Sequence, residues 1–310
     1  MKHHRNKPGF EFVVEPIEFD KYTERELLQY CLGATMYTPG TRNIADNILN
    51  KKWPELTSMV MCLEDAIAED DLAEAEENVL NTLLNLRSAL DEGSLASDDL
   101  PLFIIRVRSL EQFQGFSCKL TKEHVDLITA FNFPKFTSEN GEAYLKHLEH
   151  LNNTHKGVIY GMPILESPSI AHKETRLQEL LKLRDILLQR KELILNVRVG
   201  ATDMSSCFGV RRGIDYSIYD IITVRDCLSD VLNILGRDGV DFVISAPVWE
   251  YFLVDRSKKF EQIPNYDIHT SLLTRNKVIN AAIDGLLREI ILDKANGFIG
   301  RTVIHPTHVK

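Results

Sequence analysis

The chain has 310 residues, a length that suits one large α/β barrel or two ordinary domains. Hydrophobic residues make up 44% of it, which provides for a sizeable core and excludes a disordered chain. The formal net charge of −9 at pH 7 argues against a surface that coats nucleic acid. We therefore expect a globular protein without a nucleic-acid partner.

The five cysteines are odd in number and show no C-x-x-C spacing, which is typical of reduced cytoplasmic thiols. No run of about 18 uncharged apolar residues is present, so we expect no membrane span. Residues 1–20 lack the apolar stretch of a secretory signal. The sequence thus predicts a cytoplasmic protein with no membrane partner.

Eight short apolar segments recur along the chain and are predicted to be β-strands. They are Leu32–Thr38, Met59–Glu64, Leu102–Arg108, Leu127–Phe133, Val158–Glu166, Leu193–Gly200, Val240–Ala246 and, with the weakest propensity, Arg301–His305. Continuous apolar strands of this kind indicate a parallel sheet that is covered on both faces.

Longer amphipathic segments alternate with these strands and are predicted to be helices. The clearest are Leu72–Leu90, Thr175–Leu188, Val224–Leu235 and Ser271–Leu292. Strand–helix alternation of this length predicts βαβ units, and seven or eight such units favour a closed (β/α)8 barrel, the TIM barrel, over an open sheet. No G-x-G-x-x-G or P-loop motif opens a helix, which argues against dinucleotide and P-loop chemistry.

Charged residues gather at the carboxyl ends of the predicted strands. They are Glu64 and Asp65 after the second strand, Arg106 and Arg108 on the third, Lys135 after the fourth, Glu166 after the fifth and Asp203 after the sixth. In a parallel barrel these ends share one rim, and active sites are built there. We therefore expect these side chains to converge although they are far apart in sequence.

Glu166 and Asp203 carry the hard oxygen ligands that Mg²⁺ prefers, and Arg106 is suited to neutralise a carboxylate or phosphate. No H-E-x-x-H motif or Cys/His cluster indicates zinc. Each acid alone is also compatible with a helix N-cap or an ion pair. Arg108 and Lys135 are equally compatible with solvated or paired side chains.

Two further features stay open on residue type alone. Arg211 and Arg212 fit either an anion site or a surface loop. His305, before Pro306, fits either a catalytic residue or a structural turn.

Seven motifs in order resemble the citrate lyase β-subunit-like family (the HpcH/HpaI aldolase and citrate lyase group). They are Pro39-Gly40-Thr41-Arg42 for P-G-x-R, Leu63-Glu64-Asp65-Ala66-Ile67 for L-E-D-A-V, Ile105-Arg106-Val107-Arg108 for V-R-V-N, Phe133-Pro134-Lys135 for l-P-K, Ile164-Leu165-Glu166-Ser167 for I-E-T, Val199-Gly200-Ala201-Thr202-Asp203-Met204 for F-G-x-x-D-L, and Gly297-Phe298-Ile299-Gly300-Arg301 with Ile304-His305-Pro306 for G-f-x-G-K-x-x-I-H-P. The run that contains the first motif begins at Tyr37 and the last motif ends at Pro306, so the resemblance covers almost the whole chain.

The resemblance implies a role for each matched residue. Glu166 and Asp203 become Mg²⁺ ligands, Arg106 anchors the substrate, and Glu64 and Asp65 hold metal waters and the arginine with a possible part in acid–base catalysis. The substrate-binding residues expected in addition are Arg42, Lys135, Gly200, Ala201, Thr202 and Pro247, with Arg108 and His305 as further candidates. The implied reaction is a Mg²⁺-dependent cleavage of a carbon–carbon bond, or the reverse condensation, on a 2-oxo or hydroxy acid or its acyl-CoA thioester.

Several positions depart from the family pattern. Arg108 replaces Asn, Ser167 replaces Thr, Arg301 replaces Lys, and Thr38 stands where Val is common. These departures place the chain nearer a divergent branch of C–C bond lyases associated with tellurium-resistance and stress-response genes. The family commonly forms trimers or hexamers, which predicts a homo-oligomer.

The carboxyl-terminal part departs most from the family, because only four residues follow Pro306. We expect the last barrel helix and the C-terminal lid to be missing, which would expose an apolar seam. The expected arrangement is an N-terminal extension at residues 1–30 and a barrel at residues 31–310. The seam is then expected to be covered by Met1–Tyr30 or by a partner subunit, unless the chain is a fragment.

Two other functions remain compatible with the sequence. One is a barrel that binds a small acid without turning it over, in a stress-response biosynthetic assembly. The other is an enzyme of the phosphoenolpyruvate type, in which Arg106, Arg108 and Arg211-Arg212 clamp the anion.

Overall fold

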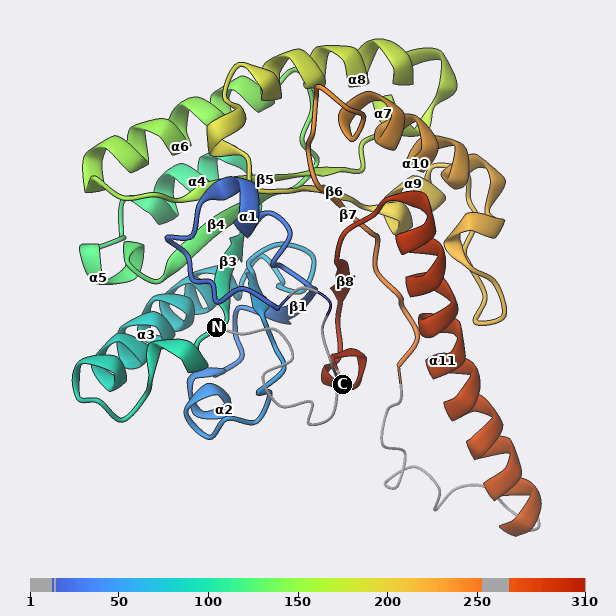
Figure 1. Ribbon diagram of the computed structural model, residues 1–310, viewed down its shortest axis with the longest axis horizontal. Coiled ribbons are helices and arrows are strands. Elements are labelled where there is room, and N and C mark those ends of the chain that lie inside the picture. Colours follow the sequence, from blue (N-terminus) through green and yellow to red (C-terminus); the bar gives the residue numbers. More distant parts are fainter. Residues whose placement is uncertain (1–12, 14, 253–267, 310) are drawn as a thin grey trace.

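Eight parallel strands form a nearly closed barrel surrounded by helices (Figure 1). The computed structural model describes residues 13, 15–252 and 268–309. The strands are β1 (Ala34–Pro39), β2 (Ser58–Cys62), β3 (Leu102–Arg106), β4 (Ile128–Phe133), β5 (Tyr160–Leu165), β6 (Val197–Val199), β7 (Ile244–Ser245) and β8 (Arg301–Val303). They pair in the order β7-β6-β5-β4-β3-β2-β1-β8, which confirms the predicted TIM barrel.

Helices connect successive strands and cover the outside of the barrel. They are α1 (Arg25–Leu28), α2 (Ala45–Leu49), α3 (Leu72–Asp91), α4 (Leu110–Ser117), α5 (Lys122–Val125), α6 (Gly141–His155), α7 (Pro168–Ala171), α8 (Lys173–Leu188), α9 (Ala201–Ser206), α10 (Ile222–Leu235) and α11 (Ile268–Asn296). None of the described helices is both long and apolar enough to cross a membrane.

All eight predicted segments overlap a strand, but the later strands are shorter than predicted. β6 begins at Val197 rather than at Leu193, because residues 191–193 form a 3-10 turn. The side-chain amide of Asn196 donates to the carbonyl of Val243 at 3.0 Å, and the same carbonyl accepts the backbone N–H of Val197 at 2.9 Å. Apolar composition alone did not reveal that the residues just before Val197 lie outside the strand.

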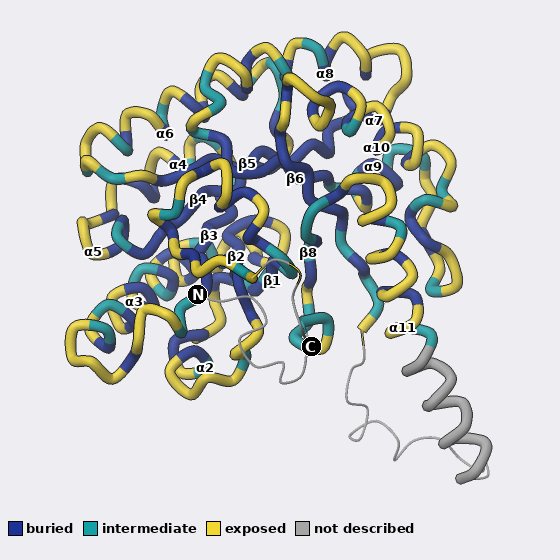
Figure 2. The backbone as a smooth tube through the Cα atoms, in the orientation of Figure 1, coloured by how far each residue is buried: buried dark blue, intermediate teal, exposed yellow. Residues whose placement is uncertain are grey.

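The strands face two separate apolar regions. Their outward side chains, such as Met59 and Met61 of β2, pack with the helices in the main core. Inward side chains near the amino ends, such as Val60 and Ile104, form a second cluster inside the barrel. Figure 2 shows the strands buried and the outer helix faces exposed. The carboxyl ends of the strands remain for polar residues.

Residues 15–30 close the amino end of the barrel. Phe19 and Leu28 are buried in the inner cluster. Lys21 Nζ donates to the carbonyls of Val125 at 2.6 Å and Ile128 at 2.9 Å. Arg25 donates to a carbonyl just before β6. The described part of this segment therefore covers the end of the barrel opposite the rim. The division into an extension (1–30) and a barrel (31–310) stays a prediction.

The seam between β7 and β8 combines a few backbone hydrogen bonds with a buried ion network. These strands share one bridge, between Ala246 and Arg301. Behind it, Glu289 of α11 is fully buried between the guanidinium groups of Arg301 and Arg212. Asp293 also pairs with Arg301 at 2.9 Å. A buried ion network thus fixes α11 against the last strand.

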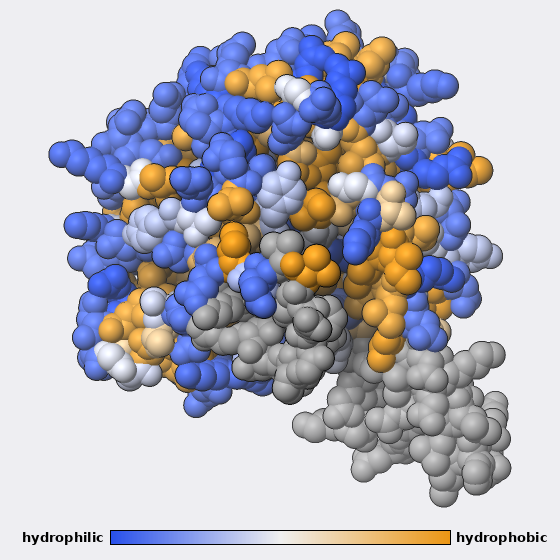
Figure 3. All heavy atoms as spheres, in the orientation of Figure 1, coloured by the Kyte–Doolittle hydropathy of each residue, from blue (hydrophilic) through white to orange (hydrophobic). Residues whose placement is uncertain are grey.

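Apolar side chains are exposed along the outer face of α11. Ile283, Leu287, Ile290 and Ile291 are between 42% and 69% exposed. Figure 3 shows hydrophobic side chains gathered over this part of the molecule. The exposed apolar surface is therefore on α11, the helix that precedes β8. The described N-terminal residues do not cover it, because they lie at the amino ends of the strands.

The buried Lys21 ammonium makes the stability of the barrel dependent on pH. Burial lowers the pKa of Lys21 to about 8 from its ordinary 10.5, although Asp126 and Asp20 act in the opposite direction. Between these pH values the unfolded chain binds the proton and the folded chain does not, so stability rises with pH there. We expect the free energy of unfolding, relative to Lys21→Met, to rise by up to about 3 kcal/mol.

Denaturant unfolding of both proteins between pH 7.5 and 10.5 measures this difference and cancels titrations common to the two. A difference that is flat or falls with pH contradicts the burial of a charged Lys21.

Candidate functional site

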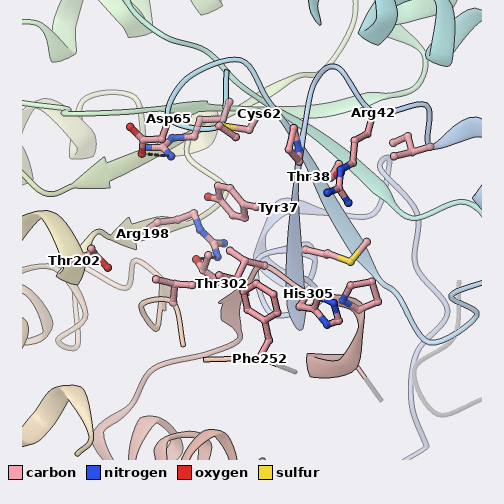
Figure 4. Close-up of a pocket in the computed structure, with 18 of the residues that line it drawn as sticks. Tyr37, Thr38, Arg42, Cys62, Asp65, Arg198, Thr202, Phe252, Thr302 and His305 are labelled. Carbon is pink, nitrogen blue, oxygen red and sulfur yellow. Dashed lines mark hydrogen bonds and ion pairs between the residues drawn. The ribbon is translucent and has the colours of Figure 1, made fainter. Parts of the chain in front are cut away.

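A cavity of about 710 Å³ lies at the carboxyl ends of the strands. Its wall includes residues from both sides of the barrel, among them Arg42 after β1, Arg106 of β3, Glu166 after β5 and His305 after β8. Figure 4 shows part of this lining. This is the rim where parallel barrels place their active sites.

Arg106 joins three carboxylates that follow two different strands, β2 and β5. Its guanidinium contacts Glu64 at 2.6 Å, Asp65 at 2.9 Å and Glu166 at 3.4 Å. Lys135 adds a second cation, with Nζ 2.5 Å from Glu64. Burial disfavours the charged guanidinium, but Glu166 and Glu64 more than offset this and raise the pKa of Arg106. Arg106 is therefore a fixed positive charge at the rim.

Glu166 is buried and faces the other acids of the rim. Its Oε1 accepts the backbone N–H of Lys135 at 3.0 Å. Lys135 adopts a left-handed conformation with φ of 47°, an uncommon backbone for a residue with a side chain, and we infer that this turn directs its N–H to the carboxylate. Burial raises the pKa of Glu166 to about 7, Arg106 opposes the shift and Asp203 adds to it.

Asp203 approaches Glu166 because neighbouring strands end side by side. The β5–β6 ladder pairs Leu165 with Val199, so Glu166 lies beside Gly200. Asp203 is in the first turn of α9, which begins directly after that glycine, and it lines the cavity. A Cβ on Gly200 would lie 2.1 Å from Glu166 Oε2, so only glycine leaves room for the carboxylate in this position.

The acids of the rim fit a divalent metal held partly by water and substrate. Four carboxylates (Glu64, Asp65, Glu166 and Asp203) meet two cationic side chains (Arg106 and Lys135), which leaves negative charge for a cation to balance. In the described part of the chain, no three His, Cys, Asp or Glu residues cluster as a closed metal cage. Two hard carboxylates with open positions suit Mg²⁺ better than zinc.

The structure brings most of the sequence-predicted residues to one place. Arg42, Asp65, Arg106, Glu166, Gly200, Thr202, Asp203 and His305 line the cavity. Glu64 lies next to it, in contact with both Arg106 and Lys135. Ala201 is buried at the start of α9, and Pro247 uses its carbonyl to accept from Arg301 at 2.9 Å.

The other predicted cations are bound by the protein itself. Arg108 donates to the carbonyls of Leu63 at 3.2 Å and Ile67 at 2.5 Å, so it braces the loop after β2. Arg212 is buried against Glu289 and stacks on Trp249, 4.7 Å from the ring centre. Neither lines the cavity, and nor does Arg211, which leaves the phosphoenolpyruvate clamp with Arg106 alone.

Sequence analysis did not identify Tyr37 and Arg198 as site residues. Both line the cavity from inside the barrel, on β1 and β6. For Arg198, the sequence did contain a signal: a charged residue stands between two valines in a predicted strand, where an apolar residue would be expected.

Gly200→Ala tests whether the position of Glu166 depends on the missing Cβ. The new methyl group would collide with the carboxylate, so we expect a loss of about 1–3 kcal/mol in unfolding free energy and a weaker affinity for Mg²⁺. Gly115→Ala is the matched control, because its Cβ would meet nothing within 4 Å in α4 and should be neutral or stabilising. Calorimetric titration with Mg²⁺ and thermal unfolding provide both readouts; wild-type values for Gly200→Ala would contradict this geometry.

Comparison with known proteins agrees with the fold and the motifs. The sequence matches, over residues 26–310, the family described as C–C bond lyase of the TIM-barrel fold. No curated protein matches it significantly in sequence.

Among solved structures, it is similar to two from Mycobacterium tuberculosis and one from Haloferax volcanii. The citrate lyase β subunit complexed with oxaloacetate and magnesium has a TM-score of 0.51 and 14% identity, over 91% of this chain and 95% of that one. The CitE protein in complex with magnesium and acetoacetate has a TM-score of 0.52 and 15% identity, over 91% and 89%. Haloferax volcanii malate synthase has a TM-score of 0.54 and 13% identity, over 89% and 72%.

These structural likenesses support the barrel fold, and the family match extends over nearly all of the sequence. The chain therefore belongs to the C–C bond lyase family of the TIM-barrel fold.

Proposed function

We propose that the protein is a Mg²⁺-dependent lyase that cleaves or forms a carbon–carbon bond in a 2-oxo or hydroxy acid or its acyl-CoA thioester. The observation that carries the proposal is the meeting of Glu166 and Asp203 at a cavity beside the fixed charge of Arg106. Magnesium complexes of the citrate lyase β subunit and of CitE among the similar structures support the choice of metal.

Glu166 and Asp203 would hold the metal. When bound, Mg²⁺ would draw electron density from the oxo group and so favour the change of charge during bond cleavage. Gly200 allows the Glu166 carboxylate to reach this position, and the Lys135 N–H orients it. These neighbours fix the carboxylate before the substrate arrives, so little reorganisation is needed during the reaction.

Arg106 would hold the substrate's carboxylate or carbonyl oxygen beside the metal. Glu64 is buried between Arg106 and Lys135, so we assign it the role of positioning both cations. Asp65 is the most exposed of the three acids on Arg106, at 58%, and it lines the cavity. Burial raises the pKa of Asp65, but Arg106 and its other neighbours lower it by more, so the carboxylate stays ionised. It would therefore serve as a base for the substrate's hydroxyl proton.

The rest of the cavity would select the substrate. Arg42, Thr202 and His305 also line it and are our candidates for contacts with the rest of the acid or with a thioester. The use of CoA, the trimeric or hexameric state and the association with tellurium-resistance genes remain predictions.

Substitution of the proposed ligands tests the metal site. Glu166→Gln and Asp203→Asn should each abolish Mg²⁺-dependent binding of pyruvate, glyoxylate or oxaloacetate, and lower any turnover on the order of 100- to 1,000-fold. Glu76→Gln is a matched control, because Glu76 is a buried acid that pairs with Lys119 outside the cavity. Calorimetry with Mg²⁺ and each acid measures binding.

A wild-type protein that binds neither metal nor 2-oxo acid would refute the site. Turnover is measured with a panel of β-hydroxy acids and their CoA thioesters. Binding of metal and acid without product from any of them would favour the non-catalytic small-acid barrel.

A further inference from the structure

Arg198 is a buried cation inside the barrel. It is the central residue of β6, between Val197 and Val199, whose side chains belong to the outer core. Arg198 is 1% exposed, yet it lines the cavity. Figure 4 shows its side chain directed toward Tyr37 and Thr302. Any ligand that fills the inner part of the cavity would therefore meet this guanidinium.

The partners of Arg198 are uncharged. Its Nη2 donates to Thr302 Oγ1 at 2.6 Å and its Nη1 to Thr35 Oγ1 at 3.4 Å. The guanidinium lies over the ring of Tyr37, 5.6 Å from the ring centre. Its Nε is buried and has no hydrogen-bond partner within the described structure. Hydroxyls and a ring face orient the cation but do not neutralise it.

The other buried arginines all have a carboxylate. Arg25 pairs with Glu26, Arg106 with Glu64, Asp65 and Glu166, Arg176 with Asp230, Arg212 with Glu250 and Glu289, and Arg301 with Glu289 and Asp293. Across residues 15–252 and 268–309, no ion pair includes Arg198. A buried charge without a counter-ion is costly, so the exception calls for a partner outside the protein.

Tyr37 does not supply the missing charge. Burial raises the pKa of Tyr37, so its hydroxyl is neutral at pH 7, and it accepts a hydrogen bond from Asn132 at 2.5 Å. Arg106 is a second cation near Arg198, and burial together with this repulsion lowers the pKa of Arg198. Arginine nevertheless stays protonated in proteins, because its intrinsic pKa is above about 12. The positive charge of Arg198 is therefore not balanced by any of these neighbours.

Strand register places Arg198 deeper in the barrel than the proposed metal ligands. Arg198 pairs with Ile164 of β5, and Glu166 follows two residues later, about 6–7 Å farther along the strand. Both residues line the same cavity. A ligand held at Glu166 and Asp203 could thus extend a second group inward to Arg198.

We propose that Arg198 binds a second anionic group of the substrate, a carboxylate or a phosphate, below the proposed metal ligands. The first group is the one held at the proposed metal site, so this inference rests on the proposed function. Arg198 would then determine specificity, because it selects acids with two anionic ends over acids with one. A bidentate guanidinium contact suits either group.

Three 2-oxo acids test this preference. In the presence of Mg²⁺, calorimetry compares pyruvate with oxaloacetate, which adds a carboxylate, and with phosphonopyruvate, which adds a phosphonate. We expect the wild-type protein to bind one of the two dianionic acids more tightly, and the stronger of them identifies the anionic group. Arg198→Met should reduce that preference by about 10- to 100-fold, and Arg198→Lys should restore part of it.

Thermal unfolding separates a binding role from a structural one. Without ligand, Arg198→Met should unfold at the wild-type temperature or above, because it removes an uncompensated buried charge. Arg176→Met is the matched control, since it removes a paired buried arginine outside the cavity. It should lower the unfolding temperature and leave the preference between acids unchanged.

Inorganic phosphate without metal tests the anion site independently of the proposed function. Phosphate should raise the unfolding temperature of the wild type more than that of Arg198→Met. If phosphate has this effect but pyruvate shows no Mg²⁺-dependent binding, the anion site is supported and the metal site is refuted. Equal effects of phosphate on both proteins, an unchanged preference in Arg198→Met, or a large ligand-free destabilisation of Arg198→Met would overturn the inference.

Discussion

The ion cluster around Arg106 is the constraint on which the arrangement of the rim depends. One guanidinium joins acids that follow β2 and β5, and Lys135 after β4 completes the group. The cluster links side chains that are separated by 41 to 71 positions in sequence. Such a group is stable only when every member is present, because the loss of one cation leaves buried acids unpaired. The same charges that hold the loops together also place Asp65 and Glu166 at the cavity.

Much of this site was predictable because its residues follow strands. Glu166 and Asp203 end apolar segments, parallel strands share a rim, and the ordered motifs supplied their identity as a pair. The role of Gly200 was less visible, since its importance lies in the space beside Glu166 rather than in any group it carries. The left-handed turn at Lys135 also follows from the acid that it faces, which a local pattern does not encode.

Sequence reasoning was weaker for the arginines, since residue type does not reveal a partner. Arg108 and Arg212 were both candidates for binding an anion. In the structure, Arg108 donates to loop carbonyls and Arg212 pairs with the buried Glu289. Arg198 was overlooked within an apolar strand, because β6 is only three residues long and its inward face is visible only once the barrel is closed. Short strands near the seam also made the bounds of β6 and β7 the least accurate part of the predicted fold.

The ion network behind β8 gives the barrel seam an unusual dependence on temperature. Most of the barrel is joined by backbone ladders and apolar packing, whereas the few backbone hydrogen bonds between β7 and β8 are backed by Glu289, Asp293 and two arginines. The cost of removing charged groups from water falls on heating, while apolar stabilisation levels off. The share of the ion network in closing the ring should therefore grow on warming, relative to the share of the apolar packing.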